Sequence, residues 1–103
     1  MRPIDILPKD LEIVRAIVGR FVPGKEVRAF GSRAIGNARR HSDLDLVIMT
    51  DRPLDVVVLA KMTAAFSESA LPFKVDVLDW ASLEEGFRRL IGEGSVVIQA
   101  SSA

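Results

Sequence analysis

The spacing of hydrophobic residues predicts a helix near the start of the chain. Charged side chains separate the apolar residues, which share one face: Leu11, Val14, Ile17, Val18 and Phe21. Pro8 suits the first turn of this helix, because its missing N–H costs no hydrogen bond there. Pro23-Gly24 then ends the helix and turns the chain.

Two further helices are expected downstream. Residues 54–69 predict a helix, although the valines at 56–58 are poor helix formers. Its residues at helical spacing are Val57, Ala60, Lys61, Ala64 and Ala65. Ser82 and Glu85 match a capping box at the start of the last helix, with Ser82 as the N-cap. We expect the stripe of this helix to face the core, with part of it as an alternative partner surface: Phe87, Leu90 and Ile91.

Short apolar or alternating runs predict the strands. They lie at 27–30, 43–50 and 73–78, with a short last strand at 96–98. Residues 32–40 read as a short helix or helical turn. The resulting order, helix–strand repeated three times and then a helix and a strand, predicts an α/β (α+β) fold. At 103 residues the chain has the size of one domain, so residues 1–103 are expected to form a single domain.

Composition narrows the classes of function. The chain is 49% hydrophobic and 27% charged, which is typical of a globular protein, and its formal net charge is zero. A neutral chain has no general electrostatic attraction to nucleic acid or to an anionic membrane. There is no cysteine, no signal-peptide pattern and no apolar run near the roughly 20 residues that a membrane span needs. We therefore expect a cytoplasmic protein that does not bind membranes.

Three aspartates supply the candidate chemistry. Asp43 and Asp45 are two residues apart in a predicted strand, so both side chains should point to one face, about 6.5–7 Å apart along the strand. Two such carboxylates repel each other unless a cation lies between them. Asp76 lies in the next predicted strand, where aspartate is uncommon. If the two strands are neighbours, all three could hold one or two Mg²⁺ ions; Asp79 is a second downstream candidate that fits the start of a turn better.

A Gly-Ser turn precedes the acidic pair. Gly31 permits close approach of the backbone to a ligand, and Ser32 offers a hydroxyl and an N–H at a helix start, which suits phosphate. Arg33 could add a phosphate contact or could be a solvated charge. For the cluster Arg39, Arg40 and His41 a surface position is favoured.

These residues together resemble a known signature. Gly31-Ser32-Arg33-Ala34-x-Gly36, followed by Ser42-Asp43-Leu44-Asp45-Leu46, is similar to the motif of the DNA polymerase β-like nucleotidyltransferase superfamily. The run Val75-Asp76-Val77-Leu78-Asp79 resembles its minimal nucleotidyltransferase (MNT) branch. The resemblance covers nearly the whole chain. One departure is Gln99, which stands where the branch often has a tyrosine.

The resemblance implies a fold and a set of roles. The fold would be a small mixed β-sheet with helices packed on one side. Asp43 and Asp45 would bind metal, Asp76 would be the third carboxylate near the attacking hydroxyl, and Gly31 and Ser32 would hold the triphosphate of ATP. MNT proteins are commonly paired with HEPN-domain ribonuclease toxins, which they neutralise as antitoxins by transferring AMP to a toxin tyrosine or by forming a complex.

Three functions therefore stand as hypotheses. The leading one is a Mg²⁺-dependent nucleotidyltransferase that transfers AMP from ATP to a partner protein, most simply a HEPN toxin. A separate protein acceptor is expected because the sequence shows no added domain that would bind an acceptor. The neutral net charge weighs against a nucleic-acid acceptor. The alternative is a non-catalytic, nucleotide-binding antitoxin or regulatory subunit. A third is transfer to a small molecule such as an aminoglycoside, which would require a homodimer.

Overall fold

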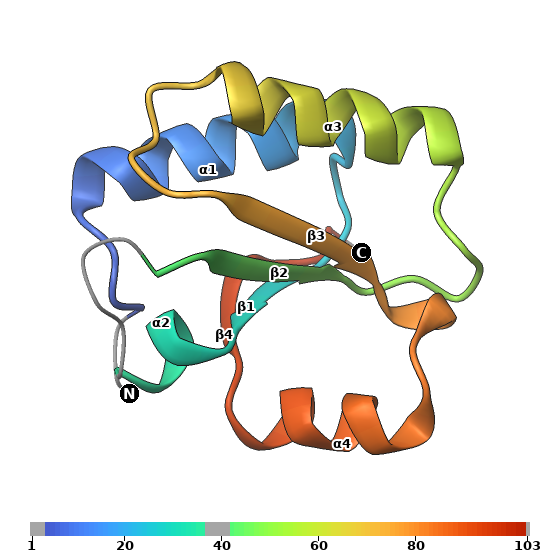
Figure 1. Cartoon of the computed structure of the whole chain (residues 1–103). Coiled ribbons are helices and arrows are strands. Elements are labelled where there is room, and N and C mark those ends of the chain that lie inside the picture. The colour runs from blue at the N-terminus through green and yellow to red at the C-terminus, as the bar shows by residue number, and fades with distance from the viewer. Residues whose placement is uncertain (1–3, 37–41, 103) are drawn as a thin grey trace.

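A four-stranded mixed sheet forms the centre of the computed structural model, which describes residues 4–36 and 42–102 (Figure 1). The strand order is β3-β2-β1-β4; β1 pairs antiparallel with β2 and β4, and β2 pairs parallel with β3. The helices and strands, in chain order, are α1 (Pro8–Phe21), β1 (Val27–Phe30), α2 (Ser32–Ile35), β2 (Leu44–Ile48), α3 (Val56–Glu68), β3 (Val75–Asp79), α4 (Glu85–Glu93) and β4 (Val96–Gln99). This order confirms the α/β prediction.

The core lies between the sheet and the pair α1 and α3. Alternation along β2 places Leu44, Leu46 and Ile48 on this face, where all three are fully buried. Helix α1 contributes Val14 and Val18 from the predicted stripe. Burial of these apolar side chains is the main force that holds the two layers together.

Helix α3 faces the core with residues that the sequence pattern did not single out. Met62 and Phe66 are its buried residues, whereas Val57 is 58% exposed. The predicted stripe through Val57, Ala60 and Ala64 was therefore wrong by about a quarter turn. The helix is nevertheless capped well, because the Asp55 side chain accepts a hydrogen bond from the Val57 N–H at 2.7 Å.

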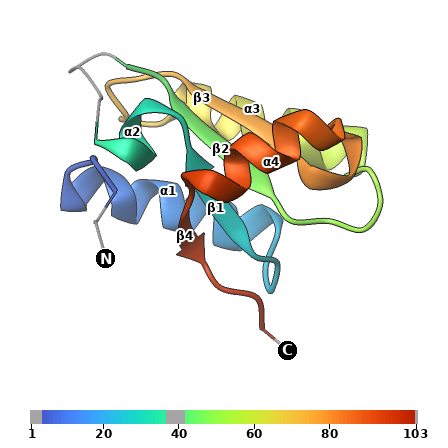
Figure 2. The same ribbon diagram turned by 90° about the horizontal axis from the view of Figure 1, so that it is seen from below.

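Helix α4 lies on the opposite side of the sheet from α1 and α3 (Figures 1 and 2). The long helices thus share one side, as expected, but α4 does not. It buries only Ile91; Phe87 and Leu90 are 41% and 67% exposed, so the prediction that all three face the core was wrong. The capping box was also wrong: Glu84 is the N-cap without a side-chain bond, and Ser82 ends a 3₁₀ turn, Trp80–Ser82.

The last strand joins the sheet at its β1 edge. β4 pairs with β1, with an irregularity between Val27 and Arg28. Gln99 donates from its side-chain amide to the carbonyls of Val22 and Lys25. It therefore fastens β4 to the turn between α1 and β1. Among the described residues, no helix is both long enough and apolar enough to cross a bilayer.

Candidate active site

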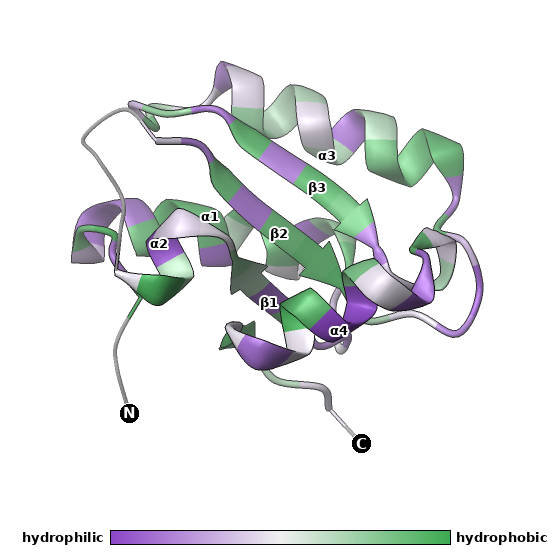
Figure 3. Cartoon of the chain, turned by 60° about the horizontal axis from the view of Figure 1, so that its bottom comes forward, coloured by the Kyte–Doolittle hydropathy of each residue, from purple (hydrophilic) through white to green (hydrophobic). Residues whose placement is uncertain are grey.

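Two aspartates stand side by side on the α4 face of the sheet. In the parallel register of β2 and β3, Asp45 is directly opposite Asp76, and neighbouring strands lie about 4.8 Å apart. Because side chains alternate along β2, Asp45 points away from the core that its neighbours Leu44 and Leu46 fill. Figure 3 shows hydrophilic segments crossing both strands next to each other, on strands that are otherwise hydrophobic. The structure thus brings together two of the three predicted carboxylates.

Asp43 precedes β2 by one residue and is exposed. Its electrostatic effect reaches the pair, because the pKa of Asp45 is raised by burial, by the charge of Asp76 and by the charge of Asp43, in that order of importance. Asp43, Asp45 and Asp76, called the acidic cluster below, thus interact electrostatically at Asp45.

Gly31 lies against the same carboxylate. β1 ends at Phe30, which pairs with Asp45, so the chain turns immediately beside the acidic cluster. A Cβ atom added to Gly31 would lie 2.5 Å from Oδ2 of Asp45, and the residue has φ 78° and ψ −159°. Glycine is required there for space and for conformation. Ser32 begins α2 directly afterwards, so the Gly-Ser turn lies beside the carboxylate of Asp45.

The described contacts of Arg33 are with backbone carbonyls and an aromatic ring of the protein itself. Its side chain is buried; Nε donates to the Ser42 carbonyl at 2.9 Å, and a terminal nitrogen donates to the Asp5 carbonyl at 2.9 Å. The guanidinium carbon also lies 4.1 Å from the centre of the Phe73 ring. The geometry does not support the predicted phosphate contact. Arg39, Arg40 and His41 lie outside the described residues.

Asp79 serves the fold. It is buried at the end of β3, and its side chain accepts hydrogen bonds from the Leu54 N–H at 3.1 Å and the Ser82 hydroxyl at 2.7 Å. This agrees with its interpretation as a turn residue. Lys74 was not predicted as part of the site, and its ammonium lies 3.4 Å from Oδ1 of Asp76. The signal was available, because Lys74 and Asp76 are two residues apart within the predicted strand 73–78, which places their side chains on one face.

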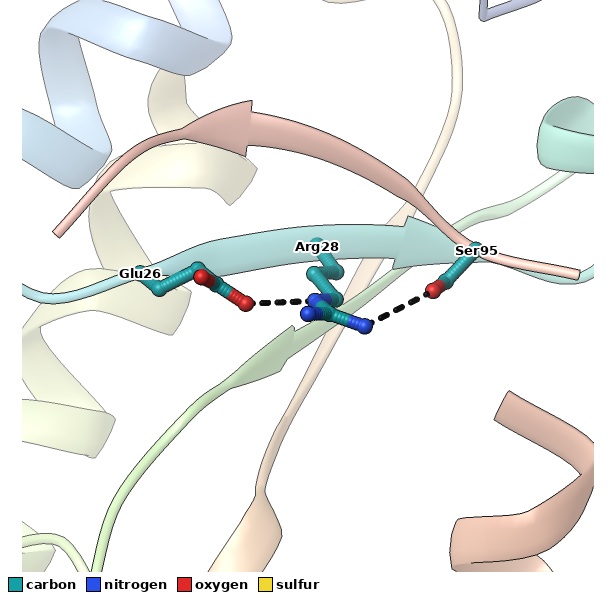
Figure 4. A network of polar contacts seen from close by, with 3 residues as sticks. All are labelled: Glu26, Arg28 and Ser95. Atoms are coloured by element: carbon teal, nitrogen blue, oxygen red, sulfur yellow. Dashed lines mark hydrogen bonds and ion pairs between the residues drawn. The ribbon is translucent and has the colours of Figure 1, made fainter. Parts of the chain in front are cut away.

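A second basic side chain on this face is already engaged. Arg28 of β1 contacts the carboxylate of Glu26 and reaches the Ser95 hydroxyl at 3.5 Å (Figure 4). These contacts tie β1 to the segment that leads into β4. Arg28 is thus held by two partners along its own edge of the sheet.

An apolar hollow of about 280 Å³ adjoins the turn at Gly31. It lies between the end of β1, α2 and α4, and Phe30 and Phe87 meet edge to face in it, with ring centres 5.8 Å apart. Ile35 and Leu90 also line it and are more than half exposed. The acidic cluster is thus bordered on its α4 side by hydrophobic surface.

The donor set fits a hard divalent cation that arrives with a phosphate ligand. Among residues 4–36 and 42–102, no group of three or more acidic, histidine or cysteine side chains is placed to hold a metal ion. Mg²⁺ does not require one, because it is usually held by one or two carboxylates together with water and substrate phosphates. Asp45 and Asp76, side by side next to Gly31, are of the residue type that such a site uses.

A mixed sheet with paired carboxylates beside a Gly-Ser turn is the arrangement of a nucleotidyltransferase. Residues 11–100 match the nucleotidyltransferase domain family, and the chain belongs to this family. It is 48% identical over 96 residues to the probable protein adenylyltransferase MntA of Haemophilus influenzae, covering 93% of this chain and 84% of that protein.

Solved structures confirm the fold. A toxin–antitoxin crystal structure with AMP-PNP aligns with a TM-score of 0.75 and 19% identity, over 90% of this chain and 75% of that one. The tri-AMPylated Shewanella oneidensis HEPN toxin in complex with MNT antitoxin aligns with a TM-score of 0.68 and 16% identity, over 90% and 71%. At these identities the likeness concerns the fold, and it agrees with the MNT branch that the sequence resembles.

Proposed function

We propose that this chain is a Mg²⁺-dependent adenylyltransferase that moves AMP from ATP to a tyrosine hydroxyl of a partner protein, a HEPN toxin, and so acts as its antitoxin. One observation carries the proposal: Asp45 and Asp76 lie side by side next to Gly31, in a chain 48% identical to a probable protein adenylyltransferase. The relatives in complexes with a HEPN toxin or with AMP-PNP support the choice of partner and nucleotide.

Each part of the site has a role in this reaction. Gly31 and Ser32 would hold the triphosphate, and Asp43 and Asp45 would hold Mg²⁺, which when bound neutralises the charge of the phosphates. Asp76 would accept the proton of the tyrosine hydroxyl. The tyrosine oxygen then forms a bond to the α-phosphorus, the bond to the leaving pyrophosphate breaks, and AMP remains on the partner.

The surface around the site suits a protein acceptor. Phe87, Leu90 and Ile35 expose hydrophobic side chains next to Gly31, and exposed apolar surface of this kind is typical of interaction sites. A tyrosine that reaches Asp76 must come from a chain that lies over this region. We also infer that the described residues act as one domain, because one core cluster joins both long helices to all four strands. We place this domain in the cytoplasm, where its proposed substrate ATP is present.

The test uses ATP labelled at the α-phosphate, Mg²⁺ and the purified product of the neighbouring reading frame as the candidate HEPN partner. We expect label on the partner's tyrosine, and a loss of at least 100-fold with Asp45→Asn. Asp51→Asn is the matched control, because Asp51 is an exposed aspartate beyond the end of β2. If Asp45→Asn still neutralises the toxin while transferring no label, the non-catalytic antitoxin is the correct function.

A further inference from the structure

We propose that Arg33 is a positioning residue that holds Asp43 in place relative to the Gly31-Ser32 turn, and thereby permits Mg²⁺ and nucleotide to bind together. The inference rests on the proposed function. It differs from the expectation that Arg33 binds phosphate, and it assigns a role to a buried cation whose described contacts are with the protein itself.

The first support is the bond from Arg33 to the residue before Asp43. Arg33 is 6% exposed, and its Nε donates to the Ser42 carbonyl at 2.9 Å. On the other side of Asp43, the N–H of Leu44 donates to the Lys74 carbonyl at 2.9 Å. Asp43 is therefore a single exposed residue between two anchored peptide groups.

The second support is that the same guanidinium joins the other segments of the site. It stacks on Phe73, which is three residues before Asp76. It also donates to the Asp5 carbonyl, and the Asp5 N–H donates back to the Arg33 carbonyl at 2.8 Å. Because Arg33 follows Ser32 directly, one side chain links the Gly-Ser turn to both acidic segments.

Lysine cannot replace this arginine. A guanidinium presents several N–H groups in one plane, so it can donate from two nitrogens while its face stacks on an aromatic ring. A lysine keeps the charge but has one nitrogen and no planar face. Arg33→Lys therefore separates an effect of geometry from an effect of charge. Because Mg²⁺ demands near-ideal octahedral geometry, a small shift of Asp43 is enough to weaken Mg²⁺-supported nucleotide binding.

Arg88 offers a matched control at the other end of β3. Its Nε and a terminal nitrogen donate to the carbonyls of Trp80 and Ala81, at 3.1 and 3.2 Å, and its guanidinium carbon lies 5.3 Å from the Trp80 ring centre. The contacts are of the same three kinds as those of Arg33, but they hold the turn before α4. Arg88→Lys should lower the melting temperature and leave Mg²⁺-supported nucleotide binding unchanged.

The experiment measures the binding of a non-hydrolysable ATP analogue by titration calorimetry, once with Mg²⁺ and once with EDTA. For Arg33→Lys we expect Mg²⁺-supported affinity to fall about tenfold or more, with affinity in EDTA unchanged. For Arg88→Lys we expect wild-type values in both. Phe73→Leu removes only the stacked ring and should give a smaller loss in the same direction; it replaces Arg33→Lys if that variant does not fold.

Two results would overturn the inference. An Arg33→Lys protein with a wild-type response to Mg²⁺ shows that Asp43 needs no such anchor, and an equal loss in EDTA shows that Arg33 acts on the phosphates directly. A wild-type protein that binds the analogue equally with and without Mg²⁺ would instead overturn the proposed function, and this inference with it.

Discussion

Gly31→Ala tests whether the turn and the carboxylates act as one site. The added Cβ would meet Oδ2 of Asp45 at 2.5 Å, so the carboxylate has to retreat by about 0.5–0.9 Å to restore a tight contact of 3.0–3.4 Å. A displacement of about 1 Å at a reacting group can cost about 100-fold in rate. We therefore expect AMP transfer to fall by between about 10-fold and 100-fold.

The same substitution also strains the backbone. At φ 78° and ψ −159° any residue other than glycine pays about 1–3 kcal/mol. In a domain of this size, each kcal/mol lowers the melting temperature by about 4–8 °C. A cost of about 2 kcal/mol therefore predicts a decrease of roughly 8–16 °C. Thermal unfolding followed by circular dichroism measures this decrease, and single-turnover transfer at a temperature well below the transition measures the chemistry.

Gly24→Ala separates the two effects. Gly24 also has a positive φ, 79°, but its added Cβ would meet only the hydroxyl end of the exposed Ser102 side chain. It should lose stability like Gly31→Ala and keep the wild-type rate. If both variants transfer AMP at the wild-type rate, Gly31 does not control the position of Asp45. If Gly31→Ala melts like the wild type, the argument from strain is wrong.

Three further outcomes are expected. Burial and neighbouring charges raise the pKa of Asp45 above 3.8, so its ionisation costs stability as the pH rises. Without Mg²⁺, Asp45→Asn should therefore raise the melting temperature at pH 7, and this gain should vanish as the pH falls below 3.8. An equal gain in melting temperature at both pH values would contradict this cause. Asp79→Ala should lose about 1–3 kcal/mol of unfolding free energy, because it leaves the half-buried Leu54 N–H and the Ser82 hydroxyl without their acceptor. Asp76→Ala should instead lose transfer and little stability, and the reverse pattern would exchange their roles. Ile91→Ala should lower the free energy of unfolding, measured in urea, by about 2–5 kcal/mol. Leu90→Ala should lower it by less than about 0.5 kcal/mol, because Leu90 is exposed. Similar losses for the two variants would show that both side chains face the core.

Local sequence patterns were sufficient for most of the secondary structure. The predicted strand 27–30 coincides with β1, and the predicted first helix coincides with α1. Both segments carry their signal within a few residues, as periodic apolar positions bounded by proline or glycine. The prediction of the α3 face failed because alanines and valines recur on several sides of that helix, so periodicity alone could not choose the side that Met62 and Phe66 occupy.

The polar interactions of α4 and its preceding turn were harder to predict. Ser82 and Glu85 have the spacing of a capping box, but the Ser82 hydroxyl donates to Asp79. A buried carboxylate next to a serine offers a stronger acceptor than a neutral group does, and the sequence does not show that the two meet. The exposure of Leu90 likewise depends on which element covers α4, and among the described residues only Ile91 of this helix is buried.

Residue types and short spacings alone were enough to indicate the chemistry. The signals were a glycine before a serine, two aspartates on one face of a strand, and a third aspartate downstream. These features are local, because side-chain direction follows from position along the strand. Whether these features meet is not local. Three features depend on how segments about 10 to 40 residues apart are aligned. They are the pairing of Asp45 with Asp76, the close approach of Gly31 to Asp45, and the contacts of Arg33 with Ser42 and Phe73. That alignment is set by burial of the face opposite the site, since a one-residue shift of β2 would turn Leu44, Leu46 and Ile48 out of the core.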